Sequence, residues 1–103
     1  MLTDDEIYNS GVPKSFYFAN HKITVELLEH DEEEAYGHWW DTMNKITLAK
    51  RSGDVDFNLT QIQATFWHEF MHCYMFFNGL YDQDERLAQT FANFMMEFNS
   101  TKQ

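Results

Sequence analysis

The feature that most constrains the fold is a long run from Leu59 to Phe77 that contains neither glycine nor proline. It ends at Asn78-Gly79, and this predicts a helix that stops there, because glycine is a common residue just past a helix end. Asn58, followed three residues later by Gln61, resembles a capping box and predicts where the helix begins. Apolar side chains occupy most of its circumference, so we expect a central, largely buried helix.

A second helix is predicted from about Asp82 or Gln83 to about Asn99, because apolar residues recur there at helical spacing. Only a few residues separate the two helices, so we expect them to be antiparallel neighbours. The apolar residues that carry this pattern are Leu87, Phe91, Phe94, Met95 and Phe98.

The first half of the chain has the period of strands. Between Lys14 and Lys50 apolar residues alternate, with a turn at 19–22, which predicts a hairpin. A second strand pair is expected at Tyr36 to Trp40 and Ile46 to Ala49, around a turn at 41–44. We therefore predict an α+β fold in which a small antiparallel sheet of three or four strands, connected as a meander, packs on the two helices.

Composition limits the class of protein. Seven Lys+Arg against 17 Asp+Glu give a net charge of −10, which argues against nucleic acid and against an anionic membrane surface as partners. A single cysteine, Cys73, excludes an internal disulfide, and no signal peptide or membrane span is apparent, so we expect a cytoplasmic protein. The length suits one domain over residues 1–103, with 1–13 and 101–103 loosely ordered.

Within the first predicted helix lies His68-Glu69-Phe70-Met71-His72, the H-E-x-x-H pattern. Histidines four residues apart share one helical face, so both imidazoles can bind one Zn²⁺. The carboxylate of Glu69 can act as the base that takes a proton from water. Two histidines and a glutamate are costly to bury in an apolar helix without a strong partner, so we predict one zinc ion per chain, bound by His68 and His72.

A catalytic zinc site needs a third protein ligand. A third histidine at position 78 is excluded, because Asn78 stands there. Glu85, in the first turn of the second predicted helix, is our choice, and the small side chain of Ala88 would let the two helices approach closely. Asp82 and Asp84 are alternatives, although each is better explained as a helix cap; Glu97 is too far along the helix.

Residues 66–95, with H-E-x-x-H followed by Glu85-Arg86-Leu87-Ala88-Gln89-Thr90-Phe91-Ala92, resemble the ImmA/IrrE family of small zinc metallopeptidases. Upstream, Gly37 to Asp41 and Lys45 to Leu48 are also similar to that family's sheet. The resemblance implies a minimal zincin-like domain with His68, His72 and Glu85 as ligands and Glu69 as base. A minimal domain of this kind is also similar to small proteins encoded by phages or mobile elements.

Other polar residues have weaker claims to a role. His38 and Tyr81 are candidate donors to an oxyanion, although a structural role for His38 is favoured. His21, in a predicted turn, and His30, in an acidic loop, are expected to be solvated, and Cys73 is expected to be a buried, inert thiol.

These residues lead to a functional expectation of a zinc-dependent peptidase. It would act on a basic or neutral protein or peptide, whose backbone would pair with an exposed sheet edge at Lys45 to Leu48. Two alternatives remain: a zinc-binding regulatory or interaction domain that cleaves nothing, and a metal-free interaction module with an acidic face.

Overall fold

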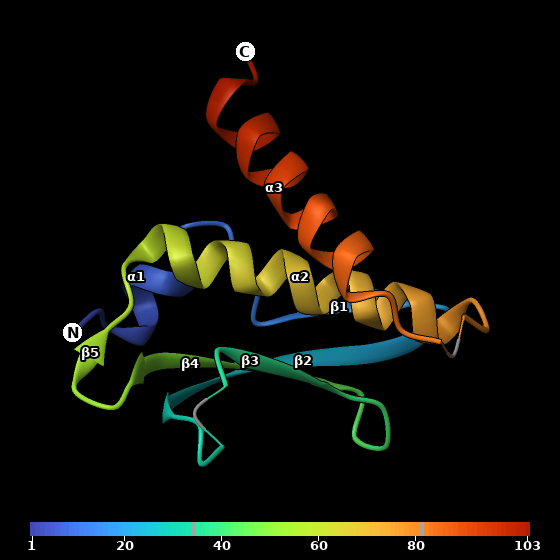
Figure 1. Cartoon of the computed structure of the whole chain (residues 1–103), viewed down its shortest axis with the longest axis horizontal. Helices are drawn as coiled ribbons and strands as arrows, with labels where there is room; N and C mark the ends of the chain where they lie inside the picture. Colours follow the sequence, from blue (N-terminus) through green and yellow to red (C-terminus); the bar gives the residue numbers. More distant parts are fainter. Residues whose placement is uncertain (34, 81) are drawn as a thin grey trace.

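The computed structural model describes residues 1–33, 35–80 and 82–103. It has a five-stranded mixed sheet with α2 packed across one face and α3 outside α2, as Figure 1 shows, and it confirms the predicted α+β class. The elements in chain order are α1 (Asp4–Tyr8), β1 (Ser15–Phe18), β2 (His21–His30), β3 (Gly37–Trp40), β4 (Lys45–Ser52), β5 (Val55–Asp56), α2 (Leu59–Phe77) and α3 (Glu85–Thr101).

The sheet differs from the predicted antiparallel meander. Its strand order is β1-β2-β4-β3, with β5 paired to β4, and the β2–β4 pair is parallel. The two predicted hairpins, β1–β2 and β3–β4, are present. What the prediction missed is that the second hairpin places β4, not β3, beside β2. The reason is burial: Ile46 to Lys50 are all buried, so β4 takes a central position and β3 lies at the edge.

This order makes one prediction about the substrate wrong. Lys45 to Leu48 do not form an exposed edge, because they pair with β2 on one side and β3 on the other. Among the described residues, the edge strand next to β4 is β3, from Gly37 to Trp40.

Helix α2 spans the predicted range, and its start is confirmed in detail. The Asn58 side chain accepts from the Gln61 backbone N–H at 2.8 Å, and the Gln61 side chain accepts from the Asn58 backbone N–H at 2.8 Å. Gly79, at a φ of +74°, follows the helix end. Helix α3 begins at Glu85, slightly later than predicted, with Asp84 as its N-cap.

The two helices are neighbours, but they are not simply antiparallel. Figure 1 shows α3 crossing α2 obliquely, so that its C-terminal half projects away from the rest of the fold. The buried residues of α3, Ala88 and Ala92, lie in its N-terminal half, whereas Phe94 and Phe98 farther along are exposed. Contact with α2 is therefore made by the part of α3 that carries Glu85.

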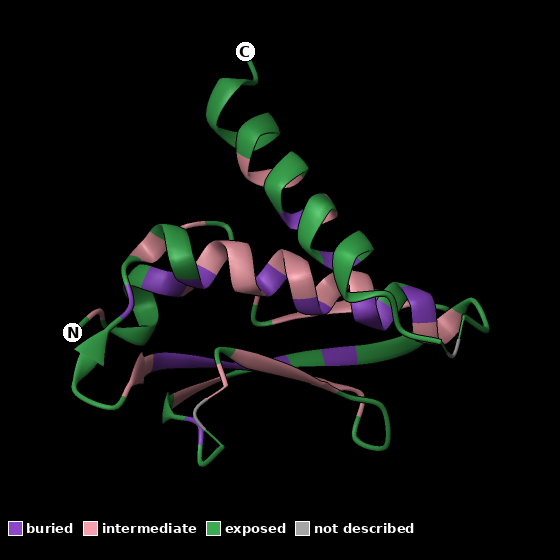
Figure 2. Ribbon diagram, viewed as in Figure 1, coloured by how far each residue is buried: buried purple, intermediate pink, exposed green. Residues whose placement is uncertain are grey.

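The core lies between α2 and the sheet, where Figure 2 shows buried segments on both layers. Residues 1–13 were expected to be loosely ordered, but they contain α1, and Ile7 and Val12 are fully buried in the core. A capping box between Thr3 and Glu6 begins this short helix. The expectation differs from the structure because two isolated apolar residues give no periodic signal.

No helix in the described part of the chain is both long and apolar enough to cross a membrane.

Candidate metal centre

Helices α2 and α3 bring three potential metal ligands together. One ligand atom from each of His68, His72 and Glu85 lies within 4.8 Å of the other two. The Nε2 atoms of the histidines are 3.3 Å apart, and each is 2.9 Å from a different oxygen of the Glu85 carboxylate. The sequence spacing predicted that the two histidines would share a face, and the short connection to α3 places the glutamate opposite them.

The other ring nitrogens of the two histidines face glutamine side chains. The Nδ1 atom of His72 is 2.6 Å from Gln83 Oε1, and the Nδ1 atom of His68 is 3.2 Å from Gln89 Oε1. Neither glutamine was predicted from the sequence. For Gln89 a signal was available, since it lies one turn after Glu85 and so shares its face of α3. Gln83 precedes the helix, so helical spacing gives no signal for it.

Glu69 lies on α2 between the two histidines, but it points toward the sheet. Its side chain is buried, and its carboxylate accepts a hydrogen bond from the backbone N–H of Trp39 on β3. Burial, and then the negative charge of Glu85, raise the pKa of Glu69 to about 8, and the hydrogen bond from Trp39 opposes this only partly. A cation bound by the neighbouring histidines would lower this pKa, because it favours the ionised carboxylate.

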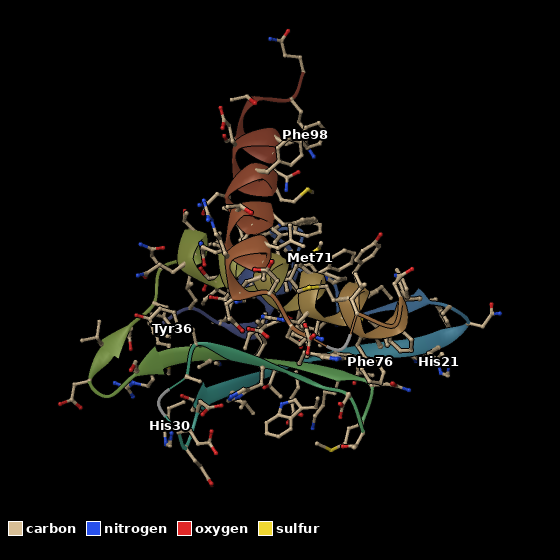
Figure 3. The ribbon with its side chains drawn as sticks, turned by 45° about the vertical axis from the view of Figure 1, so that its right-hand side comes forward. His21, His30, Tyr36, Met71, Phe76 and Phe98 are labelled. Carbon is tan, nitrogen blue, oxygen red and sulfur yellow. The ribbon has the colours of Figure 1, made fainter. Side chains whose placement is uncertain are left out.

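These side chains line a cleft of about 740 Å³ between β3 and the two helices. Figure 3 shows Tyr36 and Phe76 on either side of the base of α3, and both residues line this cleft. Glu85, with 74% of its side chain exposed, lies on the open side, whereas His72 is buried. The cleft is therefore accessible at the carboxylate ligand and closed behind the histidines.

Strand β3 lies very close to α2 at Gly37. A Cβ atom added to this glycine would be 2.7 Å from the Thr47 carbonyl oxygen and 2.8 Å from Thr65 Cγ2 on α2. Both are shorter than real contacts of a Cβ atom, so no larger residue fits without a shift. The absence of a side chain here lets the edge strand approach α2 and bring the Trp39 N–H to Glu69.

Not every candidate from the sequence joins this group. The imidazole of His38 contacts Asp31, with 3.1 Å between Nδ1 and Oδ2, and packs against Trp40. Trp39 packs on Phe76 and Phe77 of α2, so the alternation of a strand turns its neighbour His38 to the opposite face of the sheet. The structure therefore supports the structural role for His38. Tyr81, the other candidate donor, lies outside the described residues.

The alternatives for the third ligand are not brought to the histidines. Asp84 caps α3, its Oδ1 accepting from the Leu87 backbone N–H at 2.9 Å, as its alternative explanation predicted. Asp82 and Glu97 are exposed and do not belong to the cluster. His21 and His30 are exposed near the two ends of β2, and neither is among the described residues that line the cleft; the His21 ring stacks on Phe77. Cys73 is buried, and burial raises the pKa of its thiol to about 12, which keeps it unreactive.

The donor set fits a zinc ion. Two imidazole nitrogens and a carboxylate are the ligands of one common class of catalytic zinc site, in which the remaining position is open. The two Nε2 atoms and the Glu85 carboxylate, all of which can act as metal ligands, face one another at 2.9–3.3 Å. Such an arrangement is repulsive unless a cation or protons lie among them.

No family model matches the sequence, and neither the curated proteins nor the solved structures that were compared with it include a match. The basis for a functional assignment is therefore the chemistry of the cleft itself.

Proposed function

We propose that this protein is a zinc-dependent peptidase. The observation that carries the proposal is the convergence of His68, His72 and Glu85 in an accessible cleft, with the buried carboxyl group of Glu69 beside them. These three side chains would hold the zinc. When bound, zinc supplies a Lewis acid that polarises the scissile carbonyl and makes water a stronger acid.

Glu69 is the general base in this proposal. In its ionised form it takes a proton from the attacking water, and it then passes that proton to the amine that leaves. The Trp39 N–H holds the carboxylate in place during both transfers, because it donates to Glu69 from the rigid backbone of β3. Burial between α2 and the sheet keeps bulk water away from the group.

The substrate would lie along β3. This strand is at the sheet edge and borders the cleft, so an extended peptide can add to it through backbone hydrogen bonds. Asp41, Glu69 and Glu85 line the cleft, and no lysine or arginine of the described residues does. This charge favours a neutral or basic peptide over an acidic one.

The first test is the zinc content of the purified protein, with about one ion per chain expected. The second is cleavage of a mixture of synthetic peptides, followed by mass spectrometry, for the wild type and for Glu69→Gln. We expect Glu69→Gln to retain zinc and lose at least about 100-fold in rate, because it removes the general base. Glu97→Gln, on the exposed far end of α3, is the matched control and should cleave like the wild type.

The outcomes separate the alternatives. Absence of zinc would leave the metal-free interaction module. Zinc without cleavage of any peptide would favour the regulatory, non-cleaving domain. Cleavage that survives Glu69→Gln would show that Glu69 is not the base.

A further inference from the structure

Two neutral amide side chains, Gln83 and Gln89, flank the metal cluster, and neither contributes an atom to it. Both belong to the same side of the cleft, Gln83 just before α3 and Gln89 in its second turn. Each contacts one histidine through Nδ1, the ring nitrogen that faces away from Glu85. What they can control is therefore which nitrogen of each imidazole carries the proton.

The orientation of each amide is set by a contact at its other end. Gln89 Nε2 donates to Asn93 Oδ1 at 3.0 Å, which leaves its Oε1 to face His68. Gln83 Nε2 is 3.5 Å from the His72 carbonyl oxygen, which likewise turns its Oε1 toward the ring. An amide oxygen can only accept, so each of these contacts is a hydrogen bond when the imidazole donates from Nδ1. The Glu85 carboxylate, 2.9 Å from each Nε2, is a second acceptor that competes for the single proton of a neutral ring.

We propose that Gln83 and Gln89 are positioning residues that fix His72 and His68 as Nδ1–H tautomers, so that both Nε2 lone pairs point at one metal ion. The inference rests on the proposed zinc site, because without a metal ion the Glu85 carboxylate competes with the glutamines for the proton of each ring. A histidine ligand is commonly fixed through its second nitrogen, and loss of such a partner lowers metal affinity by about 10–100-fold.

The amides also keep the site from gaining charge. Glu69 and Glu85 already place two carboxyl groups around the histidines, and the charge of Glu85 contributes to the raised pKa of Glu69. An amide oxygen accepts the same hydrogen bond as a carboxylate without adding a further negative charge. Gln83→Glu should therefore keep His72 as the Nδ1–H tautomer. Gln83→Leu, which offers no acceptor, should let His72 adopt the Nε2–H tautomer.

The experiment compares Gln83→Leu and Gln89→Leu with Gln83→Glu and with Gln63→Leu. Gln63 is the matched control, because its amide donates to the Ser10 carbonyl oxygen, away from the cluster. Long-range proton–nitrogen spectra report the tautomer of each imidazole, and they are recorded in mildly alkaline solution on metal-free proteins that also carry Glu85→Ala, so that no carboxylate competes for the proton at Nε2. Competition with a chelator, in proteins that keep Glu85, reports the affinity for zinc.

We expect Nδ1–H tautomers for both histidines with Glu85→Ala alone, and also when Gln63→Leu or Gln83→Glu is added to it. Each leucine variant should release the histidine it no longer contacts to the Nε2–H tautomer and lose about 10–100-fold in zinc affinity. Nε2–H tautomers with Glu85→Ala alone, or leucine variants with unchanged tautomers and affinity, would overturn the inference. Nδ1–H tautomers with Glu85→Ala alone, together with a wild type that binds no zinc, would support the role of the glutamines and contradict the proposed function.

Discussion

Replacement of Gly37 by alanine should separate metal binding from catalysis. The new Cβ atom would lie 2.7 Å from the Thr47 carbonyl oxygen and 2.8 Å from Thr65 Cγ2. Ordinary van der Waals contact begins at 3.4 Å, so the neighbours must yield by about 0.6–0.7 Å. Thr47 belongs to the central strand β4, which is fixed on both sides, so the edge strand β3 should move instead.

The magnitude follows from that displacement. Overpacking of this size costs about 1–3 kcal/mol of the free energy of unfolding, and each kcal/mol lowers the Tm of a domain this small by about 4–8 °C. The shift also moves the Trp39 N–H away from Glu69. A misplacement near 1 Å can cost about 100-fold in rate. Zinc affinity should stay within about twofold of the wild type, because the three proposed ligands are on α2 and α3.

The assays are urea denaturation, zinc competition with a chelator, and peptide cleavage. Thr65→Ser is the second variant, because it removes Cγ2 but keeps the hydroxyl that donates to the Gln61 carbonyl oxygen at 2.9 Å. Combined with Gly37→Ala, it should restore part of the lost stability by relieving one of the two contacts. A Gly37→Ala variant that unfolds at the same urea concentration as the wild type, or whose zinc affinity falls along with its rate, would contradict this displacement of β3.

Three further predictions concern buried groups of the fold. Burial alone would raise the pKa of Asp31, but hydrogen bonds from two backbone N–H groups and the contact with His38 hold this pKa below 3.8. Asp31→Asn should therefore lower the free energy of unfolding, measured with urea at pH 7, by about 1–2 kcal/mol, and this difference should shrink as the pH falls below about 3.8. The folded pKa of Glu69, about 8, lies above its ordinary 4.5, so the Tm of the metal-free protein should fall as the pH rises from 4.5 to 8. Glu69→Gln should abolish this dependence of Tm on pH, and the same dependence in both proteins would contradict the prediction. Ala88 is fully buried on the part of α3 that contacts α2, so Ala88→Leu should push Glu85 away from the histidines and lower zinc affinity at least about 10-fold by chelator competition, whereas unchanged affinity would refute that packing.

The sequence predicted the helices well because their signals are local. The cap at Asn58, the stop at Gly79 and the spacing of His68 and His72 each depend on residues within a few positions of one another. Glu85 could be chosen for the same reason, since a short connection leaves an early residue of α3 opposite the histidines. The angle of α3 was not predictable in this way, because it depends on which of its apolar residues find a partner on α2.

The sheet could not be predicted to the same degree, because strand pairing is a choice between distant segments. Alternation located β2, β3 and β4, but it says nothing about which two lie side by side. The burial of Thr47 and Lys50 in β4 was the missing information, because a strand with buried polar residues that pairs with both β2 and β3 cannot be the edge predicted at Lys45 to Leu48. The Trp39 N–H and Gly37 could not be assigned a role without that order.

One helix divides the site between two packing interfaces. His68 and His72 lie on the face of α2 that meets α3, whereas Glu69, about 100° farther round the helix, faces β3. The contact of α2 with α3 therefore sets the geometry of the proposed metal ligands, and its contact with β3 sets the position of the proposed base. Gly37 and Ala88 allow the close approach at these two interfaces, so enlarging one should change turnover and enlarging the other should change zinc affinity.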